Sequence, residues 1–351
     1  MRGDPQEGRL AELSTTFRTL RRRLLTPNIS ATKLEVRGFY RKNPEAQELL
    51  ETVGKSFLQG YGYAVEARSA EEAEEWLAGV PRAFRGFAYE GAGMGAVVLD
   101  ALPGRRGRLA GLLAGAGRDH IYMIYVGIGW AMARLPKFLW PDVTRTDPLL
   151  RWLILDGYGF HQAYFHTDQY VYDTARHHPF SWANGPESYA ARAIDQGIGR
   201  ALWFVGGTDA DRVGDLIAAY PAHRHADLYG GAGLAATYAG GADRAELEHF
   251  AERAGAHLFS VGQGAAFAAE AREKAGTTIA HTHLATDVLC GTTPERAARV
   301  CVDLMPGPQD RGDIPAFEFW RQEIAVAIRE RRDGNGVEED DHTFTTKGVG
   351  K

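Results

Sequence analysis

The sequence predicts a mainly α-helical protein built from about seven helical hairpins of roughly 34 residues each. Glycine is unusually abundant and accounts for 42 of the 351 residues. G-x-G motifs open seven alanine-rich or aromatic runs, and successive motifs are 31, 36, 30, 40, 34 and 31 residues apart. The motifs begin at Gly60, Gly91, Gly127, Gly157, Gly197, Gly231 and Gly262. This spacing is typical of stacked helix pairs, in which each pair needs a neighbour to bury its apolar face.

The segments between the motifs have the pattern of amphipathic helices. Residues 69–93 align with residues 209–233, each with a proline ten residues before its G-x-G, and residues 241–264 are a looser copy. Each segment opens with a residue type that caps helix N-termini and continues with acidic residues. We therefore expect every unit to contain an outer amphipathic helix, a short linker and an inner helix that begins at the G-x-G.

The position four residues after the first glycine is small in six of the seven copies, which would let helix backbones approach closely. These residues are Ala64, Gly95, Ala131, Ala201, Ala235 and Ala266, and the exception is His161. A dinucleotide-binding loop would occur once, after a strand, so the seven copies indicate a structural repeat instead. The period leaves open whether the inner helices form a curved array or close into an α/α toroid.

Residues 1–30 are expected to contain an amphipathic helix outside the repeats. Apolar residues recur there at intervals of three and four, at Leu10, Leu13, Phe17, Leu20 and Leu24. Five arginines share the helix, which spans residues 7–24. Two interpretations stay open: the helix docks on the body of the protein, or it makes peripheral contact with an anionic membrane or a partner protein.

The rest of the chain is expected to form one helical-repeat domain over residues 31–332. Residues 32–41 alternate in polarity and predict a short strand, and residues 315–332 predict a last helix. Residues 333–351 are polar and charged, which is typical of a disordered tail.

Composition and motifs exclude several classes of protein. The net charge of −5 gives no electrostatic reason to expect nucleic-acid binding. The two cysteines, Cys290 and Cys301, suit a reducing cytoplasm, and no apolar run is long enough to span a membrane. We therefore expect a cytoplasmic protein, with membrane association only through residues 7–24. The sequence identifies no cofactor, and His281 and His283 lack a third residue at metal-ligand spacing, so no metal is predicted.

The middle of the chain is rich in aromatic residues, with five of the seven tryptophans between residues 120 and 204. Such density is typical of a core, and also of a pocket for a long, flat, apolar ligand. In the second case the substrate-binding residues would be Arg200, Tyr158, Trp130, Trp203 and Tyr164.

The candidate catalytic residues are His161, Asp156, Asp195 and Glu90. His161 breaks the small-residue rule of its column, although a buried histidine bonded to a backbone carbonyl is an alternative. The three acidic residues precede a G-x-G directly or nearly so, where they would cap the inner helices. If those helix ends converge on a cavity, the carboxylates would face one another and a desolvated one could act as an acid. Arg200 would pair with Asp195 or hold a carboxylate ligand.

Several longer runs resemble a known family. FRGFAYEGAGMG, LLRWLILDGYGFHQAYFHT and LYGGAGLAATYAGG are similar to the actinobacterial family catalogued as domain of unknown function 1702, and the similarity extends from about Phe17 to Ala327. Members are typically encoded beside iterative enediyne polyketide synthases, together with a membrane protein. The resemblance implies no catalytic residues.

Two functions are therefore expected from different classes. The resemblance implies an accessory factor of enediyne-type polyketide biosynthesis, which binds an apolar polyene and helps convert it to the cyclic core. The alternative is a non-catalytic helical scaffold that docks a synthase or a membrane partner. The sequence leaves open whether the protein is an enzyme.

Overall fold

The computed structural model describes residues 18–334 except 105–106, 176–181 and 183–184, and also residue 16. Helices dominate this part of the chain and it contains no β-strand, which confirms the mainly α prediction. The short strand predicted over residues 32–41 is wrong. A 3₁₀ helix (Ile29–Thr32) is followed by α2 (Leu34–Arg37), which ends at Gly38 in the left-handed region with φ 70°.

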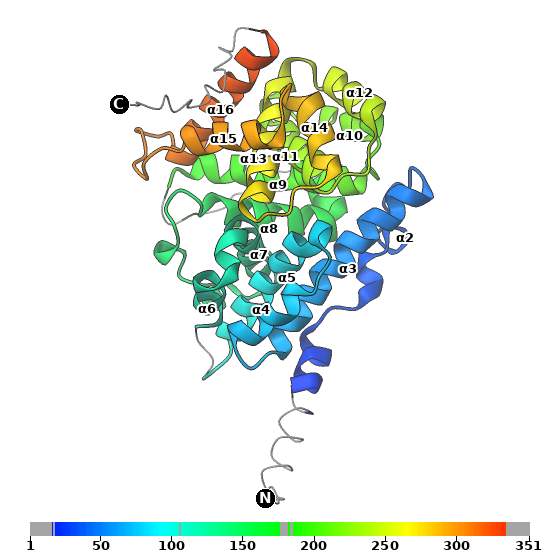
Figure 1. Ribbon diagram of the computed structural model, residues 1–351. Coiled ribbons are helices and arrows are strands. Elements are labelled where there is room, and N and C mark those ends of the chain that lie inside the picture. The colour runs from blue at the N-terminus through cyan, green and yellow to red at the C-terminus, as the bar shows by residue number, and fades with distance from the viewer. Residues whose placement is uncertain (1–15, 17, 105–106, 176–181, 183–184, 335–351) are drawn as a thin grey trace, which may run out of the picture.

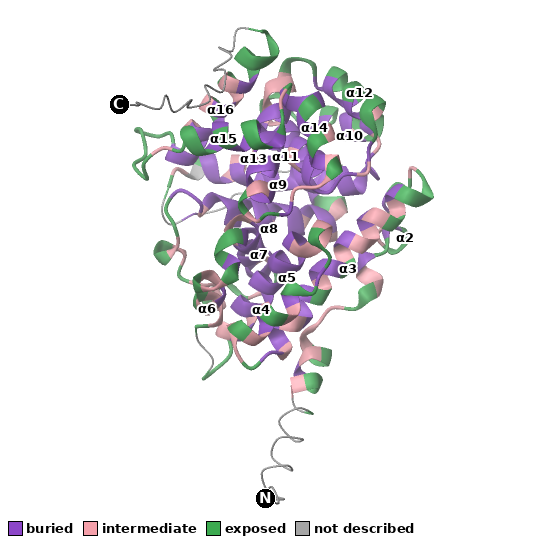
Figure 2. Ribbon diagram, in the orientation of Figure 1, coloured by how far each residue is buried: buried purple, intermediate pink, exposed green. Residues whose placement is uncertain are grey.

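Long helices that contain the G-x-G motifs form the centre of the described structure (Figure 1). They are α3 (Pro44–Glu66), α5 (Arg82–Asp100), α7 (Ile121–Arg134), α8 (Trp152–Phe165), α9 (Glu187–Val205), α11 (His225–Tyr238) and α13 (Leu258–Lys274). Each of these inner helices packs on the next one in chain order. Figure 2 shows that buried residues concentrate along them.

Shorter helices lie outside the inner ones. They are α4 (Ala70–Ala78), α6 (Arg108–Ala114), α10 (Ala210–Ala218), α12 (Arg244–Ala254), α14 (Ala280–Cys290) and α15 (Pro294–Asp303). The helix predicted near the C-terminus is α16 (Ala316–Arg332), which packs on α13.

Capping residues start the outer helices where the sequence predicts them. The side chains of Ser69, Asp209 and Asp243 cap α4, α10 and α12, and each accepts a hydrogen bond from the backbone N–H three residues later. In α12 the Glu246 carboxylate also accepts a hydrogen bond from the Asp243 N–H, which completes a capping box.

The prediction that each inner helix begins at its G-x-G is wrong, because the motif lies inside the helix. Helix α13 begins at Leu258, four residues before Gly262, and α3 begins at Pro44, 16 residues before Gly60. A glycine inside a helix costs about 1 kcal/mol relative to alanine. The motifs must therefore offset this cost through packing.

The glycines are required because neighbouring inner helices touch there through backbone atoms. A Cβ atom added to Gly91 would lie 1.9 Å from the Phe57 carbonyl oxygen of α3, and one added to Gly93 would lie 2.8 Å from the Ile124 carbonyl oxygen of α7. The same division holds in α7, α8, α9 and α11, where the first glycine faces the preceding inner helix and the second faces the following one. No side chain fits at these contacts.

The first and last inner helices each have only half of this pattern. Gly60 of α3 would place a Cβ 1.8 Å from the Ala88 carbonyl oxygen of the following helix, α5. Gly264 of α13 would place one 1.9 Å from the Gly230 carbonyl oxygen of the preceding helix, α11. Gly60 therefore corresponds to the second glycine of the other motifs, and Gly264 corresponds to the first. Relative to the other helices, the motifs of α3 and α13 are offset by two residues, in opposite directions. Each needs one close glycine because it has an inner-helix neighbour on one side.

Residues 18–25 form a helical stretch that is fastened to the body by arginines. Arg21 is buried and donates hydrogen bonds to the carbonyl oxygens of Val65, Glu66 and Ala67, at the C-terminal end of α3. Helix ends leave such carbonyl groups without intrahelical partners, so Arg21 acts as a cap. Arg22 also pairs with Glu66 at 2.7 Å. Residues 7–15 and 17 of the predicted N-terminal helix, and the tail after residue 334, lie outside the described residues.

Gly157→Ala is expected to destabilise the protein by about 3 kcal/mol or more, because overpacking at a backbone contact forces the helices apart. The added Cβ would lie 2.0 Å from the Val126 carbonyl oxygen. Gly79→Ala is the matched control, since its φ is −76° and the nearest atom to its Cβ is 3.4 Å away. Urea unfolding measures both variants, and similar small effects would contradict the packing argument.

Candidate functional site

One face of the inner helices lines a cavity at the centre of the array. Its residues recur four apart: the residue before the first glycine of the motif, and the third and seventh residues after it. In α8 and α9 these inner-face positions supply Phe160, Tyr164, Arg200 and Phe204. The centre of a water molecule can move through about 60 Å³ of this cavity. A single water needs only about 15 Å³ on this measure, so the space admits part of a larger ligand.

Glu90 and Arg200 line this cavity, and together with Asp156, which Arg200 contacts from behind the lining, they define the charged triad. Arg200 Nη1 contacts Asp156 Oδ1 directly, and Arg200 Nη2 lies 3.9 Å from Glu90 Oε1. The exposed fractions of Glu90, Asp156 and Arg200 are 3%, 4% and 6%, respectively. Buried charges need partners, and here one arginine serves two carboxyl groups.

Glu90 is the less satisfied of the two carboxyl groups. Within the described residues, no hydrogen bond of normal geometry reaches its carboxyl, although the Trp130 indole N–H lies near enough to favour the ionised form. Burial raises the pKa of Glu90 to about 7; Arg200 opposes this rise and Asp156 adds to it. Both protonation states therefore exist near neutral pH, so Glu90 can give a proton to a bound molecule or take one from it.

Asp195 does not join the charged triad. Both of its oxygens accept hydrogen bonds from Arg224, at 2.9 and 2.6 Å. Asp195 lies two residues before Gly197 rather than one, and one residue turns a helix by about 100°, so it faces elsewhere. The predicted pairing of Arg200 with Asp195 is therefore wrong, because Arg200 pairs with Asp156. The predicted capping role of Glu90, Asp156 and Asp195 is also wrong, since all three lie inside their helices.

His161 packs against Trp130 and is not among the residues that line the cavity. Its ring is perpendicular to Trp130 with a centroid distance of 5.3 Å, and it lies 4.8 Å from the Phe165 ring. Burial lowers the pKa of His161 to about 3, so the imidazole is neutral at physiological pH. Its Nδ1 lies 3.3 Å from Gln162 Oε1. The structure does not bring His161 to the charged triad, and its catalytic role stays a prediction.

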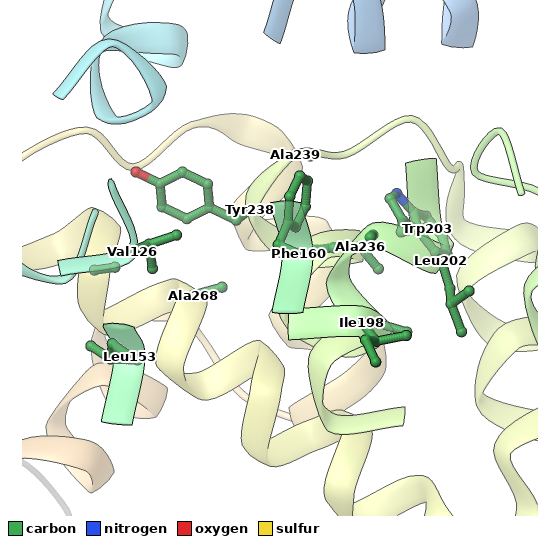
Figure 3. Packing of buried hydrophobic residues seen from close by; sticks show 14 of the residues in the cluster. Val126, Leu153, Phe160, Ile198, Leu202, Trp203, Ala236, Tyr238, Ala239 and Ala268 are labelled. Atoms are coloured by element: carbon green, nitrogen blue, oxygen red, sulfur yellow. The ribbon is translucent and has the colours of Figure 1, made fainter. Parts of the chain in front are cut away.

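Two of the predicted aromatic binding residues line the cavity and two do not. Trp130 and Tyr164 lie at inner-face positions and line it. Trp203 donates a hydrogen bond from Nε1 to the Gly240 carbonyl oxygen at 2.9 Å and packs on Phe250. In Figure 3 its indole and the Tyr238 ring lie on opposite sides of Phe160.

Tyr158 likewise points away from the cavity. Its hydroxyl accepts a hydrogen bond from Gln162 Nε2 at 3.1 Å, and its ring lies 6.4 Å from that of Trp140. The sequence interpretation missed the cavity residues Phe87, Met94, Phe204 and Tyr238. The four-residue spacing counted from each first glycine could have found Met94, Phe204 and Tyr238, whereas Phe87 lies outside that series.

A second cavity lies on the other side of Arg200. Its volume is about 40 Å³ on the same measure, and it shares Arg200, Leu234 and Tyr238 with the first cavity. Asp156 lines the second cavity, as does Glu270 of α13. The Tyr122 hydroxyl donates a hydrogen bond to Glu270 Oε1 at 3.2 Å, and burial raises the pKa of this carboxyl.

The described residues also lack a metal site and a membrane-spanning helix. No group of three or more His, Cys, Asp or Glu side chains there could hold a metal ion. None of the helices in the same part of the chain has both the length and the apolar character to cross a membrane.

A family comparison matches most of this structure. The family model described as "Protein of unknown function (DUF1702)" matches residues 16–328. The chain belongs to this family. The match to DUF1702 includes every inner helix and therefore both cavities. No curated protein and no solved structure matches the chain.

Glu90→Gln is expected to remove a pH dependence of stability. The carboxyl titrates at 4.5 when unperturbed and at about 7 in the folded protein, so between these values the folded state keeps a proton that the unfolded chain has lost. Stability therefore falls as pH rises through this window. At pH 8 the variant should be more stable than the wild type by up to about 3 kcal/mol, with little difference at pH 4. Urea unfolding across this pH range measures the difference in unfolding free energy between the variant and the wild type. A difference that does not grow as pH rises would contradict the raised pKa of Glu90.

Proposed function

We propose that this protein is an accessory factor of enediyne-type polyketide biosynthesis that binds a linear apolar polyene in its central cavity and helps convert it to the cyclic core. The observation that carries the proposal is an aromatic, buried cavity with one titratable carboxyl, Glu90, on its wall. The pathway is inferred from the resemblance of the sequence to proteins encoded with enediyne synthases.

Aromatic rings provide surfaces suited to a flat conjugated chain. The ring centroids of Phe57 and Phe160 lie 4.4 and 5.2 Å from that of Trp130, and Tyr164 stacks on Phe160. Such faces contact a π system over a large area, and burying apolar surface contributes about 25 cal/mol per Å². A polyene held there would be kept in one conformation and away from water.

The charged triad favours a neutral ligand beside it, and Arg134, which also lines the cavity, is exposed. The positive charge of Arg200 is offset by Asp156, and Glu90 adds a further negative charge when it is ionised. An anionic ligand would therefore place an uncompensated charge in a buried site, which is costly. A neutral polyene avoids this cost, and protonated Glu90 would be its proton donor.

A second candidate is a non-catalytic scaffold that docks a synthase or a membrane partner. The observation that favours it is the exposure of Leu20 and Leu24, 50% and 74%, one turn apart on the helical stretch 18–25. Because Arg21 and Arg22 of this stretch bind the body, its outward side presents leucines. This candidate does not use the cavity.

Polyene binding is expected to depend on open space in the cavity. A conjugated tetraene hydrocarbon should bind saturably and quench tryptophan fluorescence, because Trp130 lies on the cavity wall. Leu234→Trp should weaken binding about tenfold or more, since the larger side chain occupies space lined by Leu234 and removes apolar contacts. Val302→Trp on α15, where Val302 is 51% exposed, is the control and should bind like the wild type. Equal binding by both variants, or none by the wild type, would contradict the proposal.

A further inference from the structure

The two cavities are separated by side chains of α9 and α11. Arg200, Leu234 and Tyr238 line both cavities, so they form the partition between them. Such side chains can change rotamer without movement of the helix backbones. The partition is therefore a place where the two spaces can join.

The charged triad lies at this partition, and mainly apolar residues line the space on both sides of it, with Arg134 also in the lining of the first cavity and Glu270 in that of the second. Glu90 lies on the side of the first cavity and Asp156 on the side of the second, with Arg200 between them. Beyond the partition, Phe160 and Met94 line the first cavity, and Phe267 and Leu153 line the second. A ligand that occupies both cavities meets polar groups in its middle and apolar surface toward both ends.

One donor on the partition has no partner. The Tyr238 hydroxyl is buried, packs against Gly86 and makes no hydrogen bond to any described residue. Burial raises the pKa of this hydroxyl, and Arg272, whose guanidinium lies over the ring, opposes the rise. Buried hydroxyl groups are usually hydrogen-bonded, and an unpaired one costs about 1–3 kcal/mol. An oxygen atom of a ligand at the partition would satisfy this donor.

We propose that the two cavities together bind one linear apolar chain, which crosses the partition and carries a neutral carbonyl or hydroxyl oxygen in its interior, beside Arg200 and Tyr238. This inference rests on the proposed function and specifies its substrate class. The oxygen is neutral because the charged triad already balances Arg200. It is interior because the apolar space continues on both sides of the polar groups.

Isomeric ketones test the proposal directly. 6-Undecanone carries its carbonyl in mid-chain and 2-undecanone carries it near one end, whereas the two have the same composition. Displacement of the bound tetraene hydrocarbon measures their affinities for the full-length protein. We expect 6-undecanone to bind about three- to tenfold more tightly, as one additional hydrogen bond to a neutral acceptor provides.

Two variants test separately whether the ligand extends into the second cavity and whether it accepts a hydrogen bond from Tyr238. Ala271→Leu fills the second cavity, which Ala271 lines, and should abolish the preference for 6-undecanone. Tyr238→Phe should reduce the preference without loss of stability, because the hydroxyl it removes is unpaired. Tyr220→Phe is the matched control. Its hydroxyl donates to the Tyr170 carbonyl oxygen at 2.6 Å, so the change should lower stability and leave the preference intact.

The outcomes distinguish this inference from the proposed function. Equal or tighter binding of 2-undecanone would overturn the inference and leave polyene binding in place. A preference that survives both Ala271→Leu and Tyr238→Phe would also overturn it. If the tetraene itself does not bind the wild-type protein, the proposed function fails, and this inference fails with it.

Discussion

Backbone contact at glycine determines how the inner helices are placed. In the middle helices the first glycine of each motif meets the preceding helix and the second meets the following one. These two contacts fix the position of each helix along its axis and its rotation about that axis. Once rotation is fixed, residues four apart on one face must point to the centre of the array. The cavity and its lining therefore follow from the same contacts that hold the helices together.

Two buried charge clusters show what distinguishes a structural network from a candidate site. Asp227 accepts hydrogen bonds from Arg192 and Arg321, and these arginines also bind Glu318 of α16. Burial raises the pKa of Asp227, but the arginines outweigh it and the net shift is downward. Glu90 is equally buried, lacks such hydrogen bonds, and has a raised pKa. The first cluster fastens α16 to the inner helices, whereas the second leaves a carboxyl facing a cavity.

The sequence predicted the helices and their spacing because glycine and capping residues act locally, as Ser69 and Asp243 do at the starts of their helices. It misplaced the inner-helix starts because a glycine pair looks the same at a helix end and at a helix crossing. The prediction of a strand over residues 32–41 was wrong for a similar reason, because alternating polarity over so few residues also fits a short helix. The partner of Arg200 was not predictable, because it depends on the rotation of neighbouring helices.

Product formation in a reconstituted pathway tests the central claim, that the cavity-facing carboxyl acts on a bound polyene. Glu90→Gln should remain folded and bind the polyene, yet form product at least about a hundredfold more slowly, the usual contribution of a general acid or base. His161→Ala, which changes the wall behind Trp130, is the comparison. Wild-type product formation by Glu90→Gln would contradict the account and favour the scaffold.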